Sequence, residues 1–147
     1  MLRVAESITI NRPVDDVWQF LTELENTPKW DTGVRETRKT SPGPAGMGTT
    51  FQNIGPFLGR ESVREYKVTE FERPRKVTVE LAKPSTIMHK ALITYGLEPV
   101  PGGTRVTFSA SAQLAGLFRL VPSFFLRRAQ NGWQEDLANL KQLLESG

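Results

Sequence analysis

Apolar residues recur every three or four positions through the last third of the chain, from about residue 117 to residue 144. This spacing predicts an amphipathic α-helix of some twenty or more residues, roughly 30 Å long at about 1.5 Å per residue. A helix of that length must pack its apolar stripe against a large surface. The stripe holds Leu126, Ala129, Gln130, Trp133, Leu137, Leu140 and Leu144, and the opposite side holds Arg127, Gln134, Asp136, Asn139 and Lys141.

The rest of the chain predicts a strand, two short helices and six further strands. Residues 3–10 alternate apolar and polar side chains, as a half-buried strand does. Pro13 suits the first position of a helix, and the capping-box spacing of Thr22 and Glu25 predicts a second short helix that ends near Pro28. Strand-like segments follow near residues 34–39, 47–54, 58–71, 76–82, 87–98 and 103–114. The short turns between them contain Gly and Pro, which favours consecutive antiparallel hairpins.

Composition narrows the class of protein. At 147 residues, with 38% hydrophobic and 24% charged residues, the chain predicts a single domain, 1–147, with its own core. It has no apolar run long enough to span a membrane, and its N-terminus lacks a signal peptide's continuous apolar region, so we expect a cytoplasmic protein. The absence of cysteine excludes disulfides and thiolate metal sites. The net charge of +3 is scattered among acidic residues, so we predict no nucleic-acid partner.

Familiar catalytic and cofactor motifs are absent from the sequence. It has no Gly-x-Ser-x-Gly elbow, phosphate-binding loop, dinucleotide fingerprint or His-Glu-x-x-His helix. The single histidine, His89, excludes a multi-histidine metal site, and we expect neither a metal nor another cofactor. We interpret the acidic pairs Asp15/Asp16 and Glu135/Asp136 as surface charges. These patterns assign no catalytic residue.

Several motifs fall in the order and at the spacing of one known superfamily. The segment from Ile10 to Leu21 reads I-x-x-P-x-x-x-V-W-x-x-L. The later motifs are Pro28-Lys29-Trp30, Gly46-Met47-Gly48-Thr49, the segment from Tyr66 to Pro74, Gly103-Thr104-Arg105-Val106-Thr107, and the segment from Leu137 to Glu145. Over essentially its whole length, the chain resembles the START/polyketide cyclase-like superfamily, also called the SRPBCC or helix-grip fold.

The resemblance implies an α+β fold. A curved seven-stranded antiparallel sheet would carry two short helices after its first strand, and a long C-terminal helix would pack across the sheet over an apolar cavity. That superfamily includes lipid carriers, coenzyme-Q-binding proteins and polyketide aromatase/cyclases. The resemblance is therefore specific as to fold and weak as to function.

Whether the sheet and the helix enclose a solid core or a hollow decides the function. Stripes of this kind usually form a solid core. Buried tyrosine hydroxyls need partners, however, and Ala110, Ala112 and Ala129 are small where a long helix would need bulk. With the resemblance, these features favour a cavity. The candidate ligand-binding residues are Trp30, Phe51, Arg64, Tyr66, Val79, His89, Ile93, Tyr95, Phe108, Phe125, Ala129 and Trp133.

Two polar candidates and two apolar segments leave alternatives open. His89 shares strand parity with apolar neighbours, so it either points inward as a proton donor or lies half solvated at the sheet edge. Arg64 shares parity with Tyr66 and would need an anion or a carboxylate partner if it reached the hollow. Residues 54–59 and 114–126 either gate the cavity or plug its end. Gly132 costs the long helix about 1 kcal/mol relative to Ala, which indicates close packing or bending there.

Three functions agree with these observations. The leading hypothesis is binding of a hydrophobic or aromatic small molecule, such as a lipid, a quinone or a polyketide-like compound, with Tyr66, Tyr95 and His89 orienting its polar end. The second is a polyketide cyclase or dehydratase-type enzyme that uses the same cavity. The third is a regulatory protein whose apolar gate makes transient contact with a membrane or a partner. The sequence gives no oligomeric state.

Overall fold

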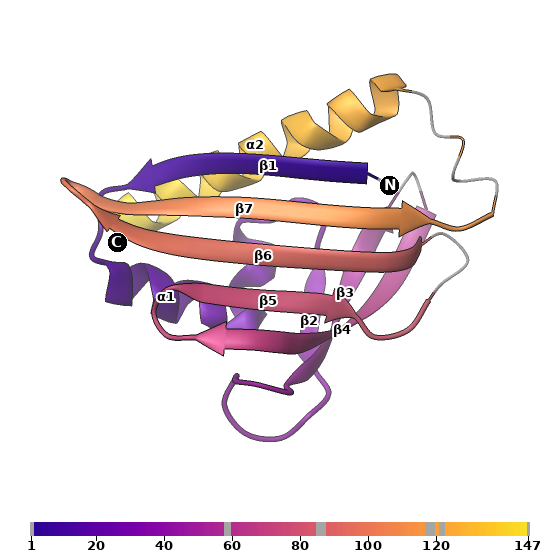
Figure 1. Ribbon diagram of the computed structural model, residues 1–147, viewed down its shortest axis with the longest axis horizontal. Coiled ribbons are helices and arrows are strands. Elements are labelled where there is room, and N and C mark those ends of the chain that lie inside the picture. Colours follow the sequence, from indigo (N-terminus) through magenta and orange to yellow (C-terminus); the bar gives the residue numbers. More distant parts are fainter. Residues whose placement is uncertain (1, 58–59, 85–87, 117–119, 121–122, 147) are drawn as a thin grey trace.

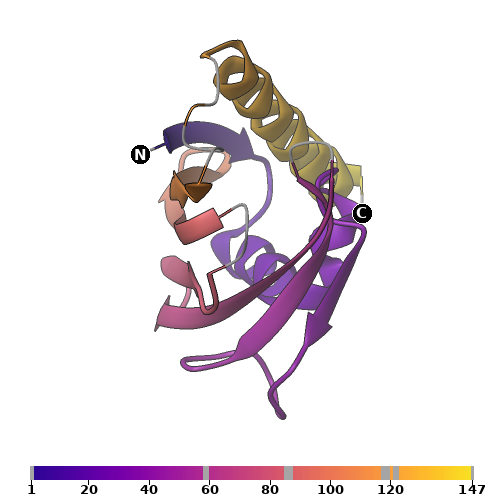
Figure 2. The same cartoon turned by 90° about the vertical axis from the view of Figure 1, so that its right-hand side faces the viewer.

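The computed structural model describes residues 2–57, 60–84, 88–116, 120 and 123–146, except for the side chains of residues 2, 57, 123–126 and 129. These residues form the helix-grip fold, with one curved sheet of seven antiparallel strands and a long helix across its concave side (Figure 1, Figure 2). The elements are β1 (Leu2–Ile10), α1 (Val14–Thr22), η1 (Leu24–Lys29), β2 (Glu36–Lys39), β3 (Thr50–Phe57), β4 (Arg60–Glu72), β5 (Lys76–Leu81), β6 (Met88–Val100), β7 (Gly103–Leu114) and α2 (Ser123–Ser146).

The strands follow a simple order in the sheet. They run β1-β7-β6-β5-β4-β3-β2, so every neighbouring pair except β1 and β7 is consecutive in the chain. This order follows from the short turns, which can join only antiparallel neighbours. The long hairpin of β6 and β7 pairs Val100 with Gly103 at its tip and Met88 with Leu114 at its open end. Its register shifts once, between Met88 and Lys90, and this irregularity changes which side chains point inward.

The C-terminal end of α2 is tied to the turn between β1 and α1. The Nε atom of Arg12 donates a hydrogen bond to the Leu144 carbonyl at 2.6 Å. The backbone N–H of Asn11 donates to the Glu145 carboxylate at 2.7 Å. The first bond uses a main-chain carbonyl that the last turn of a helix leaves without an internal partner. The two bonds hold this end of the helix against the sheet.

The same end of the molecule has a solid core. Ile10, Val17, Val106 and Leu140 are fully buried there. They come from β1, α1, β7 and α2, so four elements interlock beneath the last turns of the helix. The helix-to-sheet interface is therefore filled at the α1 end, and any hollow must lie farther toward the N-terminal half of α2.

The second short helix differs from its prediction. It is a 3₁₀ helix and begins two residues after Thr22. The capping-box prediction is wrong, because the preceding residue, Glu23, makes no side-chain capping bond. The Thr22 hydroxyl instead donates to the Trp18 carbonyl at 2.8 Å and so belongs to the end of α1. The strand bounds lie within three residues of the predicted ones.

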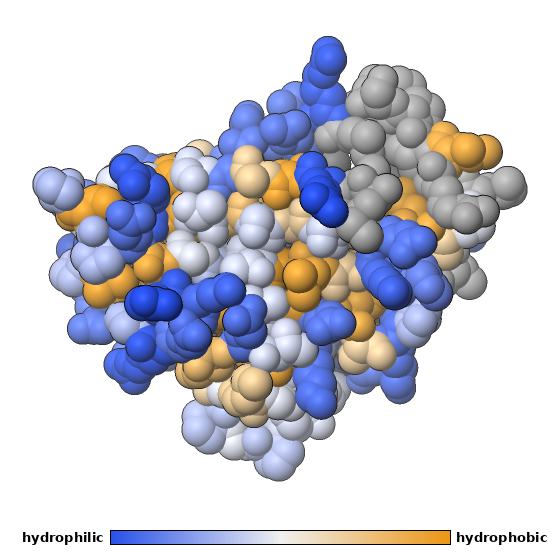
Figure 3. Space-filling model, viewed as in Figure 1, coloured by the Kyte–Doolittle hydropathy of each residue, from blue (hydrophilic) through white to orange (hydrophobic). Residues whose placement is uncertain are grey.

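The outer face of the sheet carries a mixed surface. Figure 1 looks onto this face, and Figure 3 shows polar and apolar side chains intermixed over it. Val63 and Leu92 are among its exposed large apolar side chains. Such isolated exposure is ordinary for a folded domain. Among the residues that the structure describes, no helix is both long enough and apolar enough to cross a membrane.

Candidate functional site

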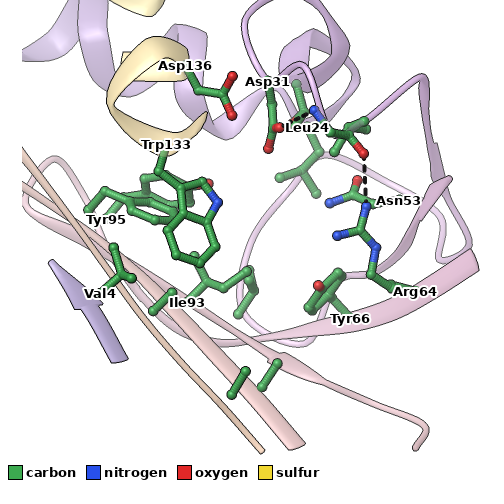
Figure 4. A pocket seen from close by; sticks show the side chains of 18 of the residues that line it. Val4, Leu24, Asp31, Asn53, Arg64, Tyr66, Ile93, Tyr95, Trp133 and Asp136 are labelled. Carbon is green, nitrogen blue, oxygen red and sulfur yellow. Dashed lines mark hydrogen bonds between the residues drawn. The ribbon is translucent and has the colours of Figure 1, made fainter. Parts of the chain in front are cut away.

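A cavity of about 620 Å³ lies between the sheet, α2 and the segment that follows η1 (Figure 4). Its walls are mainly apolar, and small residues from β7 and β6 line one side. Ala91, Ala110 and Ala112 leave space that larger side chains would fill, and Gly132 of α2 opens onto the same space. The interface is therefore hollow here, and the alternative of a completely solid core is wrong.

Most of the candidate ligand-binding residues line this cavity. They come from the end of η1, five strands and α2, which the fold brings together around one space. The candidates on its walls are Trp30, Phe51, Arg64, Tyr66, Val79, Ile93, Tyr95, Phe108 and Trp133. The side chains of Phe125 and Ala129 fall outside the described residues. Their placement stays a prediction.

His89 does not line the cavity, so its inward placement is wrong. Its side chain is exposed, whereas the preceding residue, Met88, is buried and lines the cavity. The cause is the register shift between Met88 and Lys90, which moves one residue of β6 to the other face of the sheet. Alternation counted back from Ala91 therefore gives His89 the wrong side. His89 cannot orient a ligand within the cavity.

The segments proposed as a gate or plug are only partly described. Leu114 is buried and lines the cavity, whereas Leu120 is 79% exposed. Residues 58–59, 117–119 and 121–122 and the side chains of Phe57 and Phe124 fall outside the described part. The choice between gate and plug therefore remains a prediction.

Two carboxyl groups lie close together at the polar end of the cavity. Figure 4 shows Asp31, which follows η1, beside Asp136 of α2. The Oδ1 atom of Asp136 accepts hydrogen bonds from the Thr32 backbone N–H at 3.0 Å and from its hydroxyl at 2.9 Å. The Oδ1 atom of Asp31 accepts from the Gly33 N–H at 2.9 Å. These bonds fix both carboxyl groups at the cavity wall.

The interpretation of Asp136 as a surface charge is wrong. Its side chain is only 4% exposed. Asp136 lies three positions after Trp133 and four before Leu140, so it belongs to the buried stripe of α2 by spacing. Its charge predicted the solvent-facing side of the helix, because a charged side chain is usually exposed.

The pKa of Asp31 is raised from 3.8 to about 7, mainly by burial and in addition by the nearby charge and hydrogen bond of Asp136. The Gly33 N–H and the Arg64 guanidinium oppose this rise. Two buried carboxylates at close range cannot both ionise without a compensating cation. Asp31 therefore still binds a proton near neutral pH.

Arg64 reaches the same end of the cavity from β4. Its Nη2 atom donates to the Gly33 carbonyl at 3.1 Å. The loop that carries Gly33 is held close to β3, because a Cβ built on Gly55 would lie 2.4 Å from the Gly33 carbonyl oxygen. The Arg35 N–H also donates to the Ile54 carbonyl at 2.8 Å. Only glycine at position 55 permits this approach, so β3 and β4 together position the acidic loop.

Aromatic side chains form a continuous wall below the carboxyl pair. Trp30 meets Tyr95 edge to face at 6.1 Å between ring centroids. Tyr95 contacts Phe108 at 5.2 Å, and Phe108 contacts Trp133 at 5.7 Å. Burial raises the pKa of Tyr95 well above its ordinary value, so its hydroxyl remains protonated at neutral pH. This wall presents ring faces and a hydroxyl donor to whatever occupies the cavity.

Sequence reasoning missed the acidic half of the site. Asp31 stands directly after the predicted cavity residue Trp30, but only the course of the loop brings its carboxyl group back to the wall. Asn53 also lines the cavity, and its Oδ1 atom accepts a hydrogen bond from the Thr37 hydroxyl at 2.7 Å.

No group of three or more residues suited to metal binding occurs among the described residues.

Comparison with known proteins supplies the family. The model of the family described as polyketide cyclase / dehydrase and lipid transport matches residues 1–145. The chain belongs to this family. No curated protein sequence matches it.

Solved structures repeat the fold of this family member at low sequence identity. A START superfamily protein from Mycobacterium smegmatis is 13% identical with a TM-score of 0.81, and the match covers 99% of each chain. The di-domain ARO/CYC protein StfQ from the steffimycin biosynthetic pathway is 14% identical with a TM-score of 0.77, and 99% of this chain matches 51% of that one. Ara h 8.0201 is 17% identical with a TM-score of 0.73, over 99% of this chain and 98% of that one. At these identities the likeness shows the fold alone.

Proposed function

We propose that this protein binds a hydrophobic or aromatic small molecule of the lipid, quinone or polyketide type in the cavity between the sheet and α2. The observation that carries the proposal is the space of about 620 Å³ with apolar walls and a compact polar end. Pockets of about 300–1,000 Å³ that combine apolar walls with a few polar groups suit ligands of this size. The family description, which joins polyketide chemistry with lipid transport, agrees with such a ligand.

The driving force would be removal of apolar ligand surface from water. Each Å² of apolar surface buried contributes about 25 cal/mol, before the cost of ordering the ligand is subtracted. The walls from Phe51, Ile93 and Phe108 supply contact without hydrogen bonds. The hydroxyls of Tyr66 and Tyr95 and the acidic pair supply the oriented contacts. This division predicts tight binding only for compounds with one polar end.

Tryptophan fluorescence tests the proposal with an internal control. Trp30 and Trp133 line the cavity, whereas Trp18 is buried outside its lining and contacts the lining residue Phe71 at 5.1 Å between ring centroids. A lipophile that enters the cavity should change the emission of the unaltered protein and of Trp18→Phe, and the change should shrink in Trp133→Phe. A panel of long-chain alcohols, quinones and polycyclic aromatics that changes none of these spectra would overturn the proposal.

One observation favours an enzyme as the second candidate. A carboxyl group with a pKa of about 7 can both give and take a proton near neutral pH, and Asp31 presents such a group to the cavity. This role cannot belong to His89, whose side chain is exposed away from the cavity. An aromatising cyclisation or dehydration of a polycarbonyl chain would need proton transfers of this kind. Turnover lost in Asp31→Asn and retained in His89→Ala, with binding intact in both, would establish it.

A further inference from the structure

The acidic pair leaves the polar end of the cavity short of positive charge. Asp31 and Asp136 lie side by side, and Arg64 of β4 is the one cation that acts on Asp31 among the described neighbours. Tyr66 and Tyr95 also face this end, but their raised pKa values keep both hydroxyls neutral. Arg3 lines the cavity from β1 with an exposed side chain. With both carboxyl groups ionised, one negative charge would have no local counterion.

The groups around the pair leave a place for a ligand cation. Asp136 is held by two bonds from Thr32, and Asp31 by one from Gly33, each through a single oxygen. Where the two side chains meet, the carboxyl groups share a hydrogen bond with each other. An ammonium group that replaces the proton of this bond would find both of its oxygens within reach. A protonated amine has three donors and can satisfy both oxygens.

Tyr95 points independently to a ligand at this place. Its side chain lines the cavity below the two carboxyl groups (Figure 4), and the contacts of its ring with Trp30 and Phe108 fix its position. Its hydroxyl has no hydrogen-bond partner among the residues that the structure describes. The hydroxyl borders the cavity, so a ligand there can supply its hydrogen-bond partner. The adjacent ring faces also attract cations through their quadrupoles.

We propose that this end of the cavity is a head-group site for an amphiphilic or aromatic amine, whose ammonium group lies between Asp31 and Asp136 with Tyr95 beside it. The inference rests on the proposed function and names the substrate class of the same cavity. The apolar body of the amine would lie along the aromatic wall. The ammonium charge would replace the proton held by the acidic pair, and that proton would pass to solvent.

This exchange makes amine binding depend on pH in a defined direction. Below about pH 7 Asp31 holds a proton that must leave when the ammonium group enters. Above that pH the site is already ionised, and binding releases none. For a single group with a pKa of 7, affinity should rise by about tenfold between pH 6 and pH 8. A neutral ligand of the same length should show no such rise, and a carboxylate should bind most weakly.

Isothermal titration calorimetry with octylamine, 1-octanol and octanoate tests the proposal, because these probes share a chain and differ in charge. Repeating the octylamine titration at pH 6 in buffers of different ionisation enthalpy counts the protons released. The expected result is release of close to one proton, a tenfold gain in affinity by pH 8, and the order octylamine, octanol, octanoate. Octanol binding as tightly as octylamine with no proton release would overturn the amine site and leave the lipophile cavity intact. Failure of all three to bind would count against the proposed function itself.

Matched variants locate the effect. Asp31→Asn should abolish proton release and reduce the preference for octylamine over octanol by at least tenfold. Glu135→Gln, the same change of charge on the neighbouring exposed position of α2, should behave as the unaltered protein. An equal loss of preference in both variants would overturn the assignment. The proton count needs no variant, so it decides the matter even if Asp31→Asn fails to fold.

Discussion

Gly132 offers a direct test of whether the space beneath α2 is hollow. This residue lines the cavity, and a Cβ built on it meets no atom of the described residues within 4 Å outside its own neighbours and helix backbone. The prediction of close packing at this glycine is therefore wrong. A side chain added here should enter open space, so both Gly132→Ala and Gly132→Leu should fold.

The two variants should stabilise the protein by different amounts. Replacing Gly by Ala inside a helix gains about 1 kcal/mol because Gly loses more backbone freedom on folding. Leu gains nearly as much from helix propensity and adds burial of its side chain, worth about 1.5–3 kcal/mol when complete. We therefore expect a gain of about 1 kcal/mol for Gly132→Ala and about 2–3 kcal/mol for Gly132→Leu. Urea denaturation followed by circular dichroism measures both.

Ligand binding should move in the opposite direction. Gly132→Leu occupies space that the ligand needs, so the fluorescence response to a lipophile should weaken by at least tenfold, whereas Gly132→Ala should keep most of it. If Gly132→Leu is less stable than Gly132→Ala by more than about 2 kcal/mol, the side chain has met a filled core and the cavity argument fails. If it is more stable but binds lipophiles as before, the ligand lies elsewhere.

Three further changes probe the acidic pair, the loop that carries it and the solid core. The folded-state pKa of Asp31 is raised from 3.8 to about 7, so its ionisation destabilises the protein progressively between those pH values. In urea denaturation, Asp31→Asn should therefore be more stable than the unaltered protein by up to about 4 kcal/mol at pH 8 and should gain nothing near pH 4. Gly55→Ala should displace the loop at Gly33 and weaken lipophile binding, whereas Gly46→Ala, which meets no atom within 4 Å, should not, as fluorescence titration would show. Leu140→Ala should cost about 3–5 kcal/mol of unfolding free energy and leave lipophile affinity unchanged, because this fully buried residue does not line the cavity.

The fold could be predicted from the sequence because each element carries a strong local signal. The helical period fixes α2, and the turns rich in Gly and Pro separate strands that alternate. Alternation also placed Tyr66, Tyr95 and Phe108 on the cavity side. It failed for His89, because a register shift in β6 adds a residue to one strand without any mark in composition.

The acidic half of the site could not be predicted for two different reasons. Asp136 lies on the buried stripe of α2 by spacing, but a carboxylate there is expensive unless it is paired, so charge argued for the surface. Asp31 lies in an irregular segment, where no period relates position to direction. Its approach to Asp136 depends on a contact between the Gly33 loop and Gly55, more than twenty residues away in the chain. Such long-range backbone approaches leave no local pattern.

The features that define the site all lower the stability of the fold. The cavity forgoes the packing that Ala110 and Gly132 would provide as larger residues, and the acidic pair holds charges that burial disfavours. The opposite end of the same interface, around Leu140, is packed without such costs. A sequence selected for stability alone would fill the hollow and replace the carboxyl groups. That both costs coincide in one cavity is what a binding site requires, because an occupant of complementary shape and charge would offset them together.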